Sequence, residues 1–285
     1  MNNFFAHSGI GWLLGACLAL MLTACTDSRA DHLIQKADDE WIKGHNHTAI
    51  EILKSVLDKT HTGKVVEEAL LRLGEINYFS LGNTSQALVY FQELLHLNKK
   101  DRFSYRAHKY IAEIVEFSIK DYDQAIIEYQ KLINEFGESK ENGDHQYRIA
   151  SIYYKKQDYE QALVELEVLL NNYPESAWAE ESAYKITNLL YTLNRCGEAR
   201  RHYQAFVKEY PRSEFMDEIE FVMASCLEDE GKLEDALRKF KSLEGAYPYP
   251  ALLKMKIEGI QSRIQKKMDK KNKSKFRNRS RSKKI

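Results

Sequence analysis

Residues 157–176 read QDYEQALVELEVLLNNYPES, and this stretch decides the fold because its pattern recurs along the chain. Ala162 is followed four residues later by Leu166 and seven residues later by Leu169. Side chains at offsets 0, 4 and 7 lie on one face of an α-helix. Twelve residues after the alanine comes Pro174, and proline is unfavourable inside a helix. The stretch therefore predicts an amphipathic helix that ends before this proline.

Six copies of this pattern follow one another at a nearly constant period. The aligned alanines are 38, 38, 37, 37 and 37 residues apart, at Ala49, Ala87, Ala125, Ala162, Ala199 and Ala236. A small residue stands twelve or thirteen positions ahead of the alanine in five of the copies, and Thr187 stands there in the fifth copy. The small residues are Ala37, Gly74, Ala112, Ala150 and Ala224. Each copy therefore predicts two helices that approach each other closely, and the period indicates a stack of helix pairs.

This helix-turn-helix unit resembles the tetratricopeptide repeat (TPR). The resemblance implies an all-α fold, a right-handed superhelical solenoid of about six repeats over residues 31–249, closed by a capping helix over residues 250–268. The phrases Tyr173-Pro174-Glu175-Ser176 and Tyr210-Pro211-Arg212-Ser213 also look like those of periplasmic repeat lipoproteins. Two such proteins are the BamD-type subunit of the outer-membrane β-barrel assembly machine and the coordinator of the Tol-Pal system.

The N-terminus carries a second signal. Residues 10–22, IGWLLGACLALML, form an apolar run too short to span a bilayer but typical of a signal peptide. The following Leu22-Thr23-Ala24-Cys25 resembles a lipobox, which implies a signal peptide over residues 1–24, lipidation of Cys25 and a linker over residues 25–30. No Lys or Arg precedes the apolar run, and an uncleaved hydrophobic N-terminus is the alternative. Thr26, in place of an aspartate, favours the outer membrane over the inner membrane.

Partner contacts are expected on the first helix of each repeat, because solenoids bind along an extended concave surface. In the fourth and fifth repeats the expected groove residues are Tyr147, Ser151, Tyr154, Tyr184, Asn188 and Tyr191. Tyrosine suits a protein interface, although tyrosines that fill the core between helices are the alternative. Comparable offsets in the second and third repeats hold a mixed-charge set, which indicates either a charged partner segment or a solvated face: Glu75, Tyr78, Arg106, Lys109, Glu113 and Glu116.

Charge is unevenly distributed along the chain. Residues 266–284 hold eleven of the 42 basic residues and one of the 42 acidic residues, which leaves 31 basic against 41 acidic residues elsewhere. The composition of residues 269–285 predicts a disordered basic tail. Such a tail would attract anionic lipid or an acidic protein surface, or would serve only solubility. Nucleic acid is not an expected partner of a secreted lipoprotein.

The cysteines and histidines predict little chemistry. Cys196 and Cys226 belong to neighbouring repeats, so we expect either a disulfide in an oxidising compartment or two separate thiols. His45, His47 and His61 lack the spacing of a metal site, and no nucleotide-binding or nucleophile motif is present. We therefore expect no metal, no cofactor and no enzymatic activity.

Together these patterns predict a non-catalytic protein-binding scaffold, lipid-anchored to the outer membrane and facing the periplasm. Its expected role is the assembly of an envelope complex, such as barrel assembly or a secretion, pilus or motility apparatus. A cell-division or peptidoglycan coordinator of the Tol-Pal type is the alternative. A cytoplasmic nucleic-acid-associated adaptor that uses the basic tail is a further alternative, and it would require the signal interpretation to be wrong.

Overall fold

The structure is a computed structural model that describes residues 29–97, 99–137 and 139–282. Within these ranges the chain forms helices, turns and loops and no strand, so the all-α prediction is confirmed. The chain divides into two compact units, unit 1 up to Gly137 and unit 2 from Glu138 onward.

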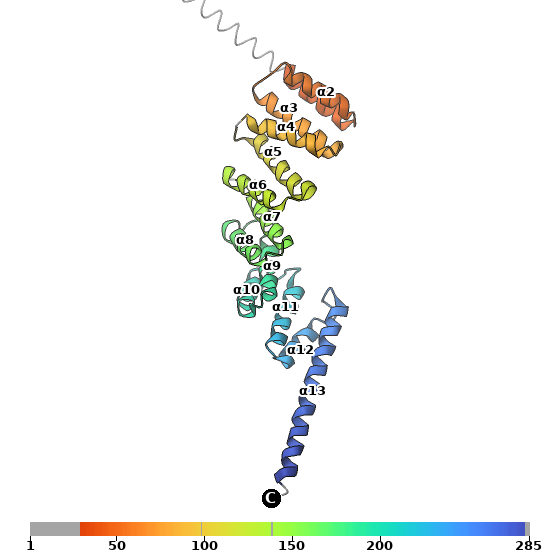
Figure 1. Ribbon diagram of the computed structural model, residues 1–285, viewed down its shortest axis with the longest axis vertical. Coiled ribbons are helices and arrows are strands. Elements are labelled where there is room, and N and C mark those ends of the chain that lie inside the picture. Colours follow the sequence, from red (N-terminus) through yellow and green to blue (C-terminus); the bar gives the residue numbers. More distant parts are fainter. Residues whose placement is uncertain (1–28, 98, 138, 283–285) are drawn as a thin grey trace, which may run out of the picture. The chain divides into compact units, whose positions relative to one another are not determined.

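Unit 1 contains three helix pairs, which Figure 1 shows in sequence order. The first pair is the helix over residues 29–42 and α2 (Asn46–Leu57). The second pair is α3 (Lys64–Glu75), extended by the π-helical turn η1 (Ile76–Ser80), and α4 (Thr84–His96). The third pair is α5 (Arg102–Glu113), extended by the π-helical turn η2 (Ile114–Ile119), and α6 (Tyr122–Glu135).

Unit 2 contains three further pairs and a long final helix (Figure 1). The pairs are α7 (Asn142–Lys155) with α8 (Tyr159–Asn172), α9 (Ala179–Thr192) with α10 (Cys196–Glu209), and α11 (Met216–Asp229) with α12 (Leu233–Ser242). The final helix is α13 (Pro250–Ser282). The helices α8 and α10 end before Pro174 and Pro211, as the sequence predicts.

The aligned alanines belong to the buried core of the helix pairs. All six have no exposed surface, because the partner helix of the same pair covers them. Most of the large residues four positions further on are fully buried as well, among them Leu53, Phe91 and Phe240. In the second repeat the contact is tighter still, since a Cβ atom on Gly74 would lie 2.2 Å from the Phe91 ring.

Polar residues start several of the second helices. Asn83, Asp121 and Asp158 precede α4, α6 and α8, and each side chain accepts a hydrogen bond from a backbone N–H three residues further on. Such caps satisfy donors that have no partner within the helix. The corresponding positions before α10 and α12 hold Arg195 and Lys232, which cannot accept such a bond.

The two π-helical turns explain why the first two intervals between aligned alanines are 38 residues long and the other three are 37 residues long. Both occur in intervals of 38 residues, η1 between Ala49 and Ala87 and η2 between Ala87 and Ala125. In both intervals a backbone hydrogen bond closes the turn into the second helix. The N–H of Asn83 donates to the carbonyl of Asn77, and the N–H of Asp121 donates to the carbonyl of Val115, so each bond spans six residues. In the fourth repeat the equivalent bond, from Asp158 to Tyr153, spans five residues. A π turn accommodates one extra residue without breaking the helix.

The final helix differs from the expectation of a short cap followed by a disordered tail. Its first half packs Leu253, Ile257 and Ile260 against a cluster that includes Phe240 and Leu243. The helix then continues to Ser282 through the segment that composition predicts to be disordered. Extending an existing helix adds one hydrogen bond per residue without a new nucleation step, and Lys, Arg, Gln and Met are good helix formers. The part of the chain for which composition predicts a disordered basic tail is therefore helical up to Ser282.

Candidate protein-binding surfaces

The first helices of unit 2 bring together the six predicted groove residues. Tyr147, Ser151 and Tyr154 lie on α7, and their counterparts in the next repeat lie on α9. Lys185 of α9 connects the two helices, because its Nζ atom lies 5.8 Å from the centroid of the Tyr147 ring and 5.9 Å from that of the Tyr154 ring. These residues of α7 and α9 thus belong to one surface, which we call the unit 2 first-helix surface.

Two of the four tyrosines on this surface also hold neighbouring repeats together. The ring of Tyr147 is buried and stacks on Trp178 with centroids 4.2 Å apart. The ring of Tyr184 stacks on Phe215 with centroids 4.7 Å apart. Trp178 and Phe215 directly precede the first helix of the next repeat, so each stack joins one repeat to its successor. These two tyrosines therefore contribute to packing whatever else they contact.

Electrostatics around these tyrosines favours neutral hydroxyl groups. The Tyr147 hydroxyl donates a hydrogen bond of 2.7 Å to Oε1 of Glu181, and burial together with this bond raises the pKa of Tyr147. Burial, with Asp229 nearby, also raises the pKa of Tyr191. The hydroxyls thus remain hydrogen-bond donors at neutral pH.

Tyr154 is the most exposed of the four tyrosines, with 52% of its surface accessible. Tyr191 is partly exposed, as are Ser151 and Asn188. Tyr184 is partly exposed as well, so the accessible part of the predicted groove is formed by Tyr154, Tyr184, Tyr191 and these two small polar side chains. Their contact with a partner stays a prediction.

Unit 1 presents exposed apolar side chains that sequence reasoning missed. Ile42 is 83% exposed, Phe79 is 57% exposed and Phe117 is 45% exposed. Each lies at or near the end of the first helix of its repeat. We call these three residues the unit 1 first-helix ladder.

A sequence signal for this ladder exists in the repeat register. Its residues stand seven or eight positions ahead of the aligned alanines, and Tyr154 and Tyr191 stand eight positions ahead of theirs. An apolar or aromatic residue therefore recurs at this position in five successive repeats. In the sixth repeat the position holds Glu228, which pairs with Lys256 and Arg263 of α13.

Beside the ladder lies a charged pocket of about 320 Å³, lined by Asp38, Trp41, Ile42, Arg72, Glu75, Phe79, Arg106 and Tyr110. At its centre the side chain of Glu75 is buried. Oε2 of Glu75 accepts a bond of 2.9 Å from Arg72, and Oε1 accepts one of 2.9 Å from the Tyr110 hydroxyl and a further bond from Arg106. Arg72 also bonds Asp38 at 2.8 Å. The pocket is thus held in shape by a paired network.

The mixed-charge set of the second and third repeats is only partly on the surface. Glu75 and Arg106 pair with each other. Glu116 is buried and accepts a hydrogen bond of 2.9 Å from the Tyr129 hydroxyl. Glu116 therefore faces neither a partner nor solvent, and the expectation for this residue is wrong.

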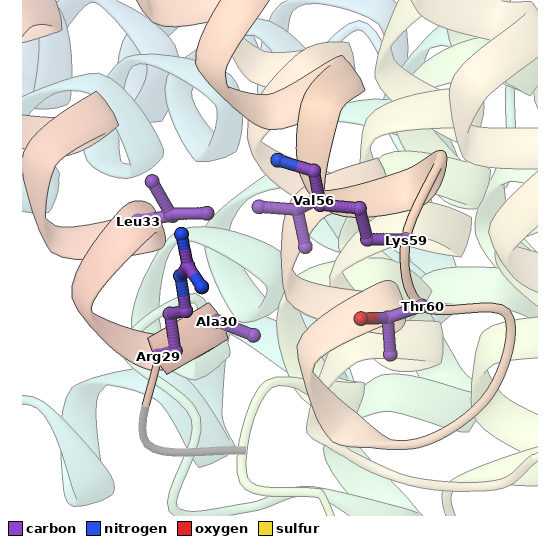
Figure 2. A pocket seen from close by; sticks show the side chains of 6 residues that line it. All are labelled: Arg29, Ala30, Leu33, Val56, Lys59 and Thr60. Atoms are coloured by element: carbon purple, nitrogen blue, oxygen red, sulfur yellow. The ribbon is translucent and has the colours of Figure 1, made fainter. Parts of the chain in front are cut away.

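A second pocket, of about 220 Å³, lies at the N-terminal end of unit 1. Figure 2 shows Arg29 and Leu33 on one side of the opening and Val56, Lys59 and Thr60 on the other. Arg29 is the first described residue. The predicted signal peptide and Cys25 lie outside the described residues, so no geometry is assigned to the lipidation site.

The sulfur atoms of Cys196 and Cys226 are joined in a disulfide, with Cα atoms 5.7 Å apart. Cys196 is the first residue of α10, and Cys226 is buried in α11. The bond therefore links the fifth repeat to the sixth.

In the described part of the chain, none of the helices is both long enough and apolar enough to cross a membrane. This part also contains no group of three or more His, Cys, Asp or Glu side chains that could hold a metal ion.

Two family models match parts of this chain, one for a repeat class and one for a protein family. A TPR family model matches residues 68–100, and the six helix pairs in register give the described chain a TPR-like fold. The model of the YfiO family, described as outer membrane lipoprotein, matches residues 103–229. The third to fifth repeats and the first helix of the sixth are thus similar to this family, which confirms the resemblance to BamD-type lipoproteins. No curated protein matches the chain.

One solved structure with a TM-score above 0.5 shows the same fold. A chain in the Naa15/Naa10 complex bound to HypK superposes with a TM-score of 0.55 at 15% identity, covering 86% of this chain and 35% of that one. A TPR protein from Parabacteroides merdae gives 0.49 at 21% identity, covering 82% and 87%. PilF from Pseudomonas aeruginosa gives 0.47 at 14% identity, covering 84% and 99%.

Proposed function

We propose that the protein is a non-catalytic scaffold, lipid-anchored at Cys25 to the outer membrane and facing the periplasm, that holds envelope proteins together. The similarity to the YfiO outer membrane lipoproteins and the lipobox-like Leu22-Thr23-Ala24-Cys25 support the anchor. The expected role is the assembly of an envelope complex, such as barrel assembly or a secretion, pilus or motility apparatus.

One observation carries the binding role: the exposed apolar or aromatic residue that recurs near the end of the first helices. Exposed apolar groups arranged in register are typical of protein interfaces, where aromatic side chains dominate the binding energy. Ser151 and Asn188 stand three residues before Tyr154 and Tyr191 on the same helices, and Nζ of Lys185 lies 5.9 Å from the centroid of the Tyr154 ring. We therefore expect the partner to offer a helical or extended segment with apolar side chains at intervals and polar groups between them.

The disulfide favours this proposal over a cytoplasmic nucleic-acid-associated adaptor. Disulfides persist in oxidising compartments such as the periplasm and are rare in the cytosol. Cys196 and Cys226 form such a bond. A Tol-Pal-type coordinator would share this compartment, so the identity of the crosslinked partner must separate the two envelope roles.

The anchor is tested by labelling cells with radioactive palmitate. We expect label on the wild-type protein and none on Cys25→Ala, because only the thiol of this residue can receive the diacylglycerol. Equal label on both proteins, or none on either, would contradict the lipid anchor.

Partner binding is tested by crosslinking in native membranes, with mass spectrometry to identify the partner. We expect Tyr154→Ala combined with Tyr191→Ala, and separately Phe79→Ala combined with Phe117→Ala, to reduce recovery of the partner. The loss should reach about thirty-fold where a pair forms a binding hot spot. Tyr147 and Tyr184 are left intact because their stacks support the fold.

A matched control is available on the second helices. Val89 of α4 and Ile127 of α6 are 51% and 45% exposed, similar to Tyr154 and Phe117. Val89→Ala combined with Ile127→Ala should leave recovery unchanged. Equal losses in this control would show that the first-helix surfaces do not bind the partner.

A further inference from the structure

The final helix is longer than its packing requires. Leu253, Ile257 and Ile260 are buried and Ile264 is partly buried, whereas every residue from Gln265 to Lys273 is exposed. Arg263 of α13 forms an ion pair of 2.7 Å with Glu228 of α11. Figure 1 shows the C-terminal half of α13 extending beyond α12. Packing within unit 2 therefore accounts for the helix only up to about Ile264.

The extension carries a concentrated positive charge. Residues 266–282, which we call the basic segment, hold nine basic residues and one acidic residue, Asp269. The carboxylate of Asp269 accepts a hydrogen bond of 3.0 Å from Gln265. The remainder of the chain has eight more acidic than basic residues. The basic segment is thus the part of the molecule that a negatively charged surface would attract.

Charge repulsion works against this helix when it stands alone. Lys266 and Lys270 are four residues apart, and Lys267 and Lys270 are three apart, so like charges are neighbours on the helix surface. A helix that is polar on all sides has no apolar face to bury. An anionic surface would remove the repulsion and so stabilise the helical form.

We propose that the basic segment binds the headgroups of anionic phospholipids at a bilayer surface. Clusters of four to eight Lys or Arg are sufficient for such attraction, which falls off within a Debye length of about 10 Å at 0.1 M salt. Single-stranded nucleic acid is less favoured, because its binding sites offer several aromatic rings for base stacking and the segment contains only Phe276. This contact is separate from the acyl chains at Cys25 and from the first-helix surfaces.

The test uses the mature chain, residues 25–285, produced without its signal so that Cys25 stays unacylated. Sedimentation with vesicles of phosphatidylcholine and increasing phosphatidylglycerol should show binding that rises with the anionic fraction and falls with salt. Changing Lys266, Lys267, Lys270 and Lys273 together to Gln should weaken partitioning by about a hundred-fold or more. Glutamine keeps a similar helix propensity, so the helical circular dichroism should be retained.

The matched control changes four exposed lysines of unit 1 to Gln: Lys36, Lys54, Lys64 and Lys100. Both variants lose the same net charge, so only a local site distinguishes them, and the control should bind as the unchanged chain does. Equal weakening of both variants, or no dependence on phosphatidylglycerol, would overturn the proposal. Tighter binding to single-stranded RNA than to phosphatidylglycerol vesicles at the same salt would also overturn it. Since the protein is unacylated, none of these results depends on the palmitate test.

Discussion

Small side chains at the helix contacts determine how closely each pair packs. Gly74 is the extreme case, because its Cα faces the ring of Phe91 in the second helix of the same repeat. The equivalent positions in other repeats accept a methyl group, as in Ala112 and Ala150, or the larger side chain of Thr187. The second repeat therefore combines its smallest residue with a large aromatic partner.

Gly74→Ala should destabilise unit 1 by about 1–3 kcal/mol, because the added methyl group overpacks the contact with Phe91. The measurement is urea unfolding. Gly197→Ala is the control, since no atom lies within 4 Å of a Cβ at that helical position and alanine favours helix. If both variants gained stability, the Phe91 ring would have to move freely away from Gly74.

The sequence predicts the buried residues within a helix better than the contacts between repeats. Offsets of 0, 4 and 7 identify one face of one helix, and Ala162, Leu166 and Leu169 are buried accordingly. The stacks of Tyr147 on Trp178 and Tyr184 on Phe215 join different helices. Helical periodicity carries no information about such pairs, because the connecting loop sets their geometry. The repeat register places the residues of the unit 1 first-helix ladder at equivalent positions. The sequence does not show that these residues are exposed, so the ladder could not be predicted from the register alone.

Among the elements, α13 combines two different segments in one helix. Up to Ile264 it covers the last repeat, and the apolar spacing of Leu253, Ile257 and Ile260 predicts this part. Beyond Ile264 no apolar spacing continues, so composition alone predicts disorder there. The difference arises because a helix already nucleated by packing extends at little further cost.

Ile260→Ala should lower the free energy of unfolding of unit 2 by about 2–5 kcal/mol, since the side chain has no exposed surface. Met255→Ala serves as the control on the same helix, because Met255 is 61% exposed and the expected change is within about 0.5 kcal/mol. Thermal unfolding measures both. Similar effects of the two changes would indicate that α13 does not cap the last repeat.

The two π-helical turns contain the extra residue of the 38-residue repeats. The spacing of 38 residues between the first alanines signals an extra residue but not its place. The structure assigns it to η1 and η2, at the ends of first helices, where Phe79 and Phe117 are exposed. The same register position is also exposed in a repeat without a π turn, at Tyr154, so the extra residue lengthens the first helix without hiding this position.

At the scale of the molecule, each unit carries its own fluorescent reporter. Of the three tryptophans, Trp12 lies in the predicted signal peptide, Trp41 lies in unit 1 and Trp178 lies in unit 2. Removing one of the latter two leaves the other as a reporter of its unit, and Trp41 is the simpler one to replace, because Trp178 supports the stack with Tyr147.

Cys196→Ser combined with Cys226→Ser should lower the stability of unit 2 by about 3 kcal/mol, because the cross-link closes a loop with a sequence separation of 30 and restricts the unfolded chain. Trp178 fluorescence in a Trp41→Phe background would follow this change during urea unfolding. Reductant should shift the unchanged protein to the same midpoint and have no effect on the double variant. If reductant also shifted the unfolding midpoint of the double variant, the loss of stability on reduction would not come from this disulfide.

The disulfide has one more consequence, which concerns the count of free thiols. The newly made chain has four, at Cys17, Cys25, Cys196 and Cys226. In the proposed export route, oxidation removes two, acylation blocks the third and signal cleavage discards the fourth. The finished molecule would then contain no free thiol at all. Each intermediate of the export route would therefore have its own number of free thiols. Counting alkylated cysteines on each intermediate would give the order of oxidation, acylation and signal cleavage.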